Sequence, residues 1–372
     1  MERTDLYVGL DVGEQRTSVC VVGGGGETLR EDTCATSIEG LEAILGHFPV
    51  GSISRVAMEA GNDVHIARKL LARGYPVSVF EARKASKFLA IRRNKTDASD
   101  AKGLADLARL GRHSVSEVRL KSVECQLLRS ELLMRQKLVK VRVTVEASIR
   151  SRLAMYGRPL KLPNCYRSIR GMIEAEADAL FAAEGIDIRP HLAPLTDISA
   201  RLREYLRAFD HSLERRAFAH PVCKLLMGIP GVGPISALSF YSAIEDPHRF
   251  RPASNVGAFL GLAPRRYQSG DVSRTIGITK TGNKMTRTHL VTAAIMLRKS
   301  AKDTALGEWA TKLSERLGRR RANVALARKL AVVMLAMWKT GAPYRARETG
   351  SAAKVEGSRS ALADIASQHG RR

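Results

Sequence analysis

The stretch that decides the fold of the N-terminal part is Asp5-Leu-Tyr-Val-Gly-Leu-Asp-Val-Gly-Glu-Gln-Arg-Thr-Ser-Val-Cys-Val-Val22. Two apolar runs flank a short turn that contains Gly13, a pattern that predicts a hairpin of two strands. Further along, residues 53–58 and 75–80 are predicted as strands. Residues 37–47, 62–72 and 97–110 are predicted as helices, with Asn62 as a cap of the second. This order of elements is typical of an α/β sheet with helices packed on its faces.

Four acidic residues stand where such a sheet can bring them to one edge. Asp11 and Glu59 each end a predicted strand, and Asp97 and Asp100 share one face at the start of a helix. Because a buried carboxylate without a partner is costly, convergence of the four acids requires cations, and oxygen-only ligands favour Mg²⁺ or Mn²⁺. Two such ions can clamp the attacking and leaving oxygens of a phosphodiester. Each acid also has an ordinary reading, since Asp97 suits a helix cap and acids are favoured in a first turn.

The charge of the chain indicates a polyanionic partner. With 61 Lys and Arg against 37 Asp and Glu, the formal net charge is +24, which is typical of nucleic-acid-binding proteins. Between the strand at 75–80 and Asp97, a cluster that includes Arg92, Arg93 and Lys95 is expected either to grip a phosphate backbone or to be a solvated helix face. The five cysteines are scattered, which disfavours a zinc site and a disulfide framework and fits a reducing cytoplasm. No membrane span and no secretory signal are expected.

The middle of the chain is predicted to be a helical spacer. Residues 117–155 hold almost no Gly or Pro and carry an apolar stripe at helical spacing. After an irregular segment with Pro163, Pro190 and Pro194, a second helix carries a stripe from Ile198 to Leu213. The two helices are expected to pair as an antiparallel coiled coil or to associate between subunits.

The C-terminal third has a glycine-rich turn between two helices, Ile229-Pro-Gly-Val-Gly233, which resembles a helix-hairpin-helix. Gly231 and Gly233 would let the backbone approach a phosphate. A segment dense in Gly and cations follows at 259–284, with Ser269 expected in a loop. From the residues alone, Ser269 suits a turn or a phosphate contact better than a nucleophile, because a nucleophilic serine needs activation.

The cations near Ser269 are the expected phosphate contacts of this third, and the arginines among them would stabilise a pentavalent phosphate. They are Arg265, Arg266, Arg274 and Lys280. Further helices are predicted at 284–299 and 321–339, with Trp309 and Trp338 as packing anchors. The domain boundaries expected from these patterns are 1–112, 113–217, 218–345 and a mobile basic tail at 346–372.

Several separate motifs together resemble one known family, and their order and spacing make the resemblance more specific than any single motif. These motifs are Gly9-Leu10-Asp11, Met58-Glu59-Ala60, Asn94-Lys95-Thr96-Asp97-Ala98-Ser99-Asp100-Ala101, Ile229-Pro230-Gly231-Val232-Gly233, Gly261-Leu262-Ala263-Pro264-Arg265-Arg266, Gln268-Ser269-Gly270 and Lys280-Thr281-Gly282-Asn283. Over roughly residues 5–345 the chain resembles the DEDD transposases of insertion sequences of the insertion-sequence-110 type.

This resemblance implies a RuvC-like N-terminal domain of the ribonuclease H class and a C-terminal transposase domain. With the helices predicted above, the expected fold is an α/β RuvC-like domain, an α-helical coiled-coil spacer and a mainly α-helical C-terminal domain. It implies that Asp11, Glu59, Asp97 and Asp100 bind Mg²⁺ or Mn²⁺ and that Ser269 is the nucleophile. The implied reaction is strand exchange between donor and target DNA through a covalent seryl-DNA link. The implied partners are a structured guide RNA from the element itself and further subunits, in a dimer or tetramer. A bacterial, cytoplasmic and nucleoid-associated location is expected.

Two other functions remain open on the residues alone. One is a Holliday-junction-type endonuclease that uses water and Mg²⁺, in which Ser269 only contacts DNA. The other is a non-catalytic scaffold that binds nucleic acid, in which the acids cap helices and hold no metal.

Overall fold

The structure is a computed structural model that describes residues 5–61, 63–90, 96–110, 117–163, 165, 167–269, 272–302 and 304–345. At residues 266, 269 and 272–276 it describes the backbone but not the side chains. The expected cap Asn62, the cations at 92, 93 and 95 and the tail at 346–372 lie outside the described residues. The chain divides into two compact units, residues 1–121 and 122–372.

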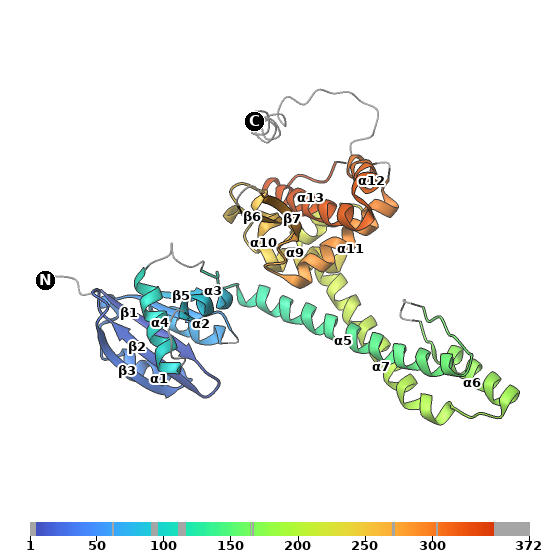
Figure 1. Ribbon diagram of the computed structural model, residues 1–372, viewed down its shortest axis with the longest axis horizontal. Coiled ribbons are helices and arrows are strands. Elements are labelled where there is room, and N and C mark those ends of the chain that lie inside the picture. Colours follow the sequence, from blue (N-terminus) through green and yellow to red (C-terminus); the bar gives the residue numbers. More distant parts are fainter. Residues whose placement is uncertain are drawn as a thin grey trace, which may run out of the picture. The chain divides into compact units, whose positions relative to one another are not determined.

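The first unit is built on a mixed five-stranded sheet with the strand order β3-β2-β1-β4-β5 (Figure 1). The strands are β1 (Leu6–Val12), β2 (Arg16–Val22), β3 (Thr28–Ala35), β4 (Ile53–Glu59) and β5 (Val77–Phe80). The first three pair antiparallel, whereas β1 with β4 and β4 with β5 pair parallel. The predicted hairpin is thus confirmed, and the sheet fits the expected RuvC-like class. Strand β3 was missed because most of its residues are exposed and polar.

Helices cover both faces of this sheet. On one face, α1 (Ile38–Leu45) and α2 (Val64–Ala72) bury their apolar sides against Val8 and Leu10 of β1. On the other face, α4 (Asp97–Leu110) packs against β1, β2 and β4, with α3 (Ala82–Leu89) beside it. Gly9 faces α4, and a Cβ atom at this position would lie 1.9 Å from the carbonyl oxygen of Ala101. Because glycine lacks that atom, the backbones of β1 and α4 come into direct contact.

The helical spacer begins later than predicted. Helix α5 (Val123–Met155) is capped by the Ser122 hydroxyl, which accepts from the N–H of Cys125. The residues from 117, predicted as helical, instead continue extended beside β5, where the N–H of Val118 donates to the carbonyl of Val79 (2.7 Å). Edge pairing with the sheet therefore overrides the helical pattern of these residues.

The proline-containing segment before the second helix is also more regular than predicted. It forms α6 (Arg170–Glu184) and the first turns of α7 (Arg189–Ala219). Pro190 lies in the first turn of α7, where a helix needs no N–H donor, and Pro194 is accommodated inside the helix. The expected irregular structure is therefore wrong beyond residue 169, because proline at a helix start does not interrupt the helix.

Helices α5 and α7 pack side by side, as Figure 1 shows. At their interface Arg203 donates to a carboxylate oxygen of Glu146 (2.8 Å), and both side chains are buried. The predicted apolar stripe of α5 is confirmed only near the end of the helix, where Ile149 and Leu153 are buried in one cluster with Leu192 of α7. Nearer its start, Leu127 and Met134 are 58% and 56% exposed, and Leu128 and Leu132 belong to the buried core instead. Helix α5 carries two apolar faces, and periodicity alone does not reveal which one a neighbour covers.

The rest of the second unit is a helical core with one hairpin (Figure 1). Its elements are α8 (Pro221–Leu226), α9 (Pro234–Ile244), α10 (Asn255–Phe259), β6 (Pro264–Ser269), β7 (Val272–Ile278), α11 (Lys284–Ser300), α12 (Ala305–Leu317) and α13 (Arg319–Thr340), with short 3₁₀ turns at 50–52 in the first unit and 247–249 in this one. Trp309 and Trp338 pack against this core, which confirms their expected role. Among the described helices, none combines the length and the apolar character that a bilayer crossing requires.

Candidate active site

Two of the predicted acids lie at the same end of neighbouring strands. Strands β1 and β4 are parallel, and their register pairs Leu10 with Met58. The next residue of each strand is an acid, so Asp11 and Glu59 stand side by side in the register. Both are half-buried. The parallel pairing, which the sequence does not reveal, is what places the two together.

The first turn of α4 lies toward the same end of β1. At the other end of α4, the carbonyl of Ala108 accepts from Arg55 (3.2 Å), which pairs with Tyr7 near the beginning of β1. Because Gly9 contacts Ala101 midway, the helix runs antiparallel to β1. Its beginning, with Asp97 and Asp100, is therefore directed toward the carboxyl end of β1, where Asp11 lies.

Thr96, not Asp97, caps α4. The Thr96 hydroxyl accepts from the backbone N–H of Ser99 (3.1 Å), and the Ser99 hydroxyl accepts from the N–H of Thr96 (3.4 Å). This reciprocal pair gives the backbone N–H groups of Thr96 and Ser99 hydrogen-bond acceptors at the start of the helix, as in a capping box. The reading of Asp97 as the cap is therefore wrong, although an acid in the first turn still gains from the helix dipole.

The four acids supply the ligand chemistry of a hard divalent ion, since all their donor atoms are carboxylate oxygens. Their side chains do not form a closed ligand sphere. In the described part of the chain, no group of three or more His, Cys, Asp or Glu side chains is arranged to hold a metal ion. Asp97 is exposed, and Asp100 is half-buried. The fold thus directs the four positions toward one end of the sheet, without arranging three or more of these carboxylates around a common point.

Ser269 lies on a hairpin of the second unit. It is the last residue of β6 and pairs with Val272 of β7. The expected loop position is therefore wrong, because the glycine-rich segment pairs with itself as an antiparallel ribbon. Arg265 on β6 is exposed. For Arg266 and Arg274 the structure gives the strand positions alone.

The base of this hairpin is held by close backbone contacts. Gly261 has φ +69°, and a Cβ atom there would lie 1.9 Å from the carbonyl oxygen of Thr281. Arg287 donates to the carbonyls of Leu260 (3.0 Å) and Thr281 (3.1 Å), which stand before β6 and after β7. Burial lowers the pKa of Arg287. These contacts fasten both ends of the hairpin to α11, a role of Arg287 that the sequence analysis missed.

Two family descriptions match the regions that carry these residues. Residues 8–157, which hold all four acids, match a family described as "Transposase", of the DEDD type found in IS110 elements. Residues 223–308, which hold Ser269, match "Transposase IS116/IS110/IS902 family". A transposase for insertion sequence element IS1111A from Coxiella burnetii is 32% identical over 298 residues, covering 78% of this chain and 79% of the relative. The chain belongs to the IS110 family of transposases.

Other relatives of this transposase carry names of the same kind. A probable family 20 transposase from Pseudomonas aeruginosa is 29% identical over 300 residues, which are 78% of this chain and 85% of the relative. A transposase for element IS1328 from Yersinia enterocolitica is 28% identical over 286 residues, which are 74% and 81% of the two chains. The protein is therefore a DNA transposase, and its substrate is DNA.

The two glycines of the predicted helix-hairpin-helix have different surroundings in this transposase. Gly231 has φ +86°, and a Cβ atom there would lie 2.6 Å from the backbone nitrogen of Leu297 in α11. Its lack of a side chain thus serves packing inside the protein. Gly233 caps α9, and no described heavy atom lies within 4 Å of where its Cβ would be. Lys280 is exposed and has φ +55°.

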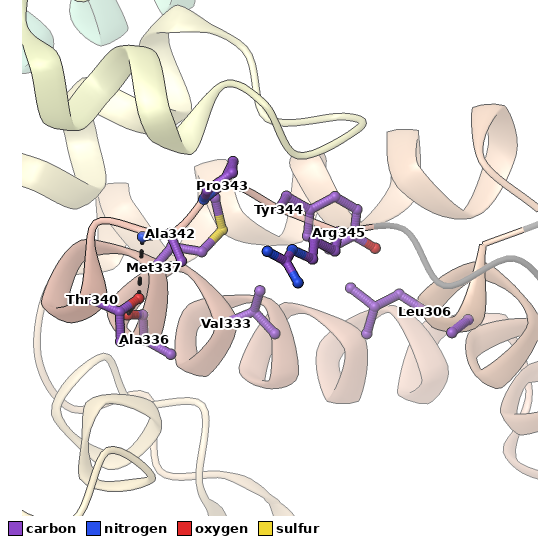
Figure 2. Close-up of a pocket in the computed structure, with 10 residues that line it drawn as sticks. Leu306, Val333, Ala336, Met337, Thr340, Ala342, Pro343, Tyr344 and Arg345 are labelled. Atoms are coloured by element: carbon purple, nitrogen blue, oxygen red, sulfur yellow. Dashed lines mark hydrogen bonds between the residues drawn. The ribbon is translucent and has the colours of Figure 1, made fainter. Parts of the chain in front are cut away.

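A separate hollow of about 350 Å³ is lined by the start of α12, the last turns of α13 and the residues that follow α13 (Figure 2). Its lining is mainly apolar and includes Leu306, Val333, Met337 and Tyr344. Burial raises the pKa of Tyr344. This hollow lacks the carboxylates that phosphoryl chemistry requires, so we assign it to the packing of residues 342–345 against the helices of the transposase.

Proposed function

We propose that this transposase cuts and exchanges DNA strands through a covalent link between Ser269 and a DNA phosphate. The acids Asp11, Glu59, Asp97 and Asp100 hold divalent ions for the reaction, Mg²⁺ or Mn²⁺. The observation that carries the proposal is the adjacent register of Asp11 and Glu59 in a chain of the IS110 family. The start of α4 is directed toward the same end of the sheet, which supports a shared role of the four acids.

The chemistry conserves the number of phosphodiester bonds. The Ser269 oxygen forms a bond to phosphorus while the phosphorus–oxygen bond to one DNA strand end breaks, and the serine proton passes to the departing oxygen. The hydroxyl of an exchanged strand end then attacks the same phosphorus, and the serine leaves with its proton restored. No ATP is needed, and the sequence holds no G-x-x-x-x-G-K-[ST] phosphate-binding loop.

In the proposed reaction, residues of the chain hold the divalent ions, position the attacking serine and neutralise the charge of the phosphate. Carboxylate-held divalent ions supply charge stabilisation and lower the pKa of a bound hydroxyl. Arg265, Arg266 and Arg274 stabilise the negative charge of the pentavalent phosphate, a task for which a permanently charged guanidinium is suited. Arg287 ties both ends of the hairpin to α11, and a hairpin held at its base favours the positioning that an in-line attack on phosphorus requires.

The remaining proposed nucleic-acid contacts are to phosphates and are independent of sequence. They are Gly231, Gly233, Lys280, Arg92, Arg93 and Lys95. A structured RNA encoded by the element would supply sequence specificity by pairing with donor and target DNA. In this proposal Gly233, whose surroundings are open, contacts phosphate more directly than Gly231.

Association into a dimer or tetramer is part of the same proposal. Leu127, Met134 and Val141 follow each other at intervals of seven residues on α5 and are exposed, which supports a coiled-coil contact with a second subunit. The acids belong to the first unit and Ser269 to the second. The proposed reaction therefore requires these units to meet on DNA, within one subunit or between two. We place the protein with the bacterial nucleoid in the cytoplasm, where its DNA substrate lies.

The decisive experiment compares Ser269→Ala with Ser273→Ala. The register sets Ser273 opposite Gln268 on the same hairpin, so it is a matched control hydroxyl. Wild type and Ser273→Ala should form a protein–DNA adduct that survives denaturation, whereas Ser269→Ala should form none and exchange no strands. If Ser269→Ala still cuts DNA, water is the nucleophile and the protein acts as a junction-type endonuclease.

The acids are tested with Asp100→Asn and, as control, Asp106→Asn on the same helix. The first change should abolish adduct formation in Mg²⁺ or Mn²⁺ while leaving DNA binding in place, and the second should keep both. A wild type that binds DNA without divalent ions and cuts no junction substrate would instead favour a scaffold.

Sequencing of the nucleic acid that co-purifies with the protein tests the guide RNA: a short, discrete RNA that maps beside the coding region is expected.

A further inference from the structure

A corner between two helices of the second unit concentrates positive charge away from the proposed active site. Helix α12 ends at Leu317, Gly318 turns the chain with φ +77°, and α13 begins at Arg319. We define the α12–α13 corner by its five cations. These are Lys312, Arg316, Arg319, Arg320 and Arg321.

The side chains of the corner are available to a partner. All five are exposed. No ion pair or side-chain hydrogen bond joins any of them to another described residue, and Glu315 is the one acid within residues 312–321. By contrast, Arg216 in α7 is paired with Glu131 (2.9 Å). The corner therefore differs from the arginines that this fold uses for its own packing.

The placement of three arginines at the start of α13 does not serve the helix. The positive end of the helix dipole disfavours cations there. The first turn has no acid, and Gly318 offers no capping side chain. The neighbouring helix α12 starts in the opposite way, with Thr304 as its cap and Glu308 in its first turn. The stability of α13 therefore does not explain why three arginines stand at its start, whereas the binding of an anion from outside the chain would explain it.

We propose that the α12–α13 corner binds the phosphate backbone of duplex DNA, as a contact in addition to the proposed active site. Guanidinium groups match phosphate oxygens in charge and in the spacing of their donors. Residues 312–321 contain no aromatic side chain, so stacking on bases plays no part. The contact is therefore independent of DNA sequence and orients the duplex. The proposal rests on DNA being the substrate and not on the role of Ser269.

The test uses the full chain and a fluorescent duplex DNA, with affinity measured over a range of salt concentrations. In one variant Arg319, Arg320 and Arg321 are replaced by Gln, and in the matched control the same three are replaced by Lys. Three lost phosphate contacts, at about 0.9 counterions each, lower the slope of log affinity against log salt by about 3. At 0.15 M salt the same loss weakens binding by roughly 100-fold. The Lys variant should keep the slope.

A second variant, Lys312→Gln with Arg316→Gln, leaves the start of α13 intact and should lower the slope by about 2. Wild-type slopes and affinities in both Gln variants would overturn the proposal. It would equally be overturned if the Lys variant lost as much as the Gln variant, because charge would then not be the cause. A loss confined to a folded RNA probe, with duplex DNA bound as by wild type, would assign the corner to RNA and overturn the assignment to DNA.

Discussion

Replacing Gly9 by alanine tests whether the contact between β1 and α4 positions the acids. A Cβ atom at residue 9 would lie 1.9 Å from the carbonyl oxygen of Ala101 and 2.3 Å from the nitrogen of Ala105. Both are backbone atoms of α4, so no side chain can rotate away. To reach even a 3.0 Å contact, α4 must move by at least 1.1 Å, the difference between 3.0 and 1.9 Å.

Such a displacement carries Asp97 and Asp100 with the helix, away from Asp11 and Glu59. A misplacement of about 1 Å at a reacting centre can cost about 100-fold in rate. The same overpacking should lower the free energy of unfolding by about 1–3 kcal/mol. The expected result is therefore a transposase that is folded at low temperature, melts earlier and exchanges strands about 100-fold more slowly.

The assay pairs thermal unfolding by circular dichroism with strand exchange on a donor DNA that carries the element's ends, measured well below the melting midpoint. Gly51→Ala is the matched control in the same unit, because no described heavy atom lies within 4 Å of the added Cβ. It should behave like wild type in both measurements. If Gly9→Ala exchanged strands at the wild-type rate with an unchanged midpoint, the inference that α4 is seated directly on β1 would be refuted.

Three further changes have defined outcomes. Gly261→Ala forces a Cβ onto the carbonyl of Thr281 at a backbone with φ +69°, so strand exchange should fall by about 100-fold. Arg203→Met leaves the Glu146 carboxylate buried without its main partner, so denaturant unfolding should show a loss of about 3–5 kcal/mol. Burial lowers the pKa of His289 to about 4 from 6.5, so the unfolded chain takes up this proton first. Stability is then complete above pH 6.5 and falls toward pH 4 by up to about 3 kcal/mol, a fall that His289→Gln should reduce.

Each of these three substitutions has a control or a result that would contradict its expected cause. Gly171→Ala in α6 adds a Cβ with no described heavy atom within 4 Å, so it should leave exchange unchanged, in contrast to Gly261→Ala. Adding Glu146→Gln to Arg203→Met should recover part of the lost stability, and no recovery would contradict a buried-charge cause. An identical pH dependence in wild type and His289→Gln would show that this imidazole does not carry the effect.

The parts of the fold that the sequence predicted are those in which local pattern and tertiary packing agree. Strands β1, β2 and β4 have apolar runs that a buried sheet requires, and α4 has a regular helical stretch. Strand β3 escaped prediction because an edge strand needs no apolar alternation. Residues 117–120 were misassigned because pairing with the sheet edge, a contact between segments distant in sequence, overrides local preference.

The features of the candidate site likewise include some that the sequence predicted and some that it did not. That Asp11 and Glu59 lie at the carboxyl ends of strands could be read from the residues, because each follows an apolar run, although β1 continues one residue beyond Asp11 to Val12. That Thr96 rather than Asp97 caps α4 could not, since either side chain suits a cap and only the structure shows that the Ser99 N–H donates to the Thr96 hydroxyl. The anchoring by Arg287 also left no local signal, because its two carbonyl partners stand on either side of the hairpin.

By itself, the sequence determined the polyanionic partner, the kinds of ligand atoms available for a metal and the motifs of the family. Charge, donor chemistry and short motifs are properties of single residues and their neighbours along the chain. The tertiary structure alone decided that β4 lies parallel beside β1, that α4 runs back along β1, and that Gly231 faces α11. Strand order, helix direction and close backbone approach arise from contacts between distant segments, and periodicity within a segment carries no information about its partner.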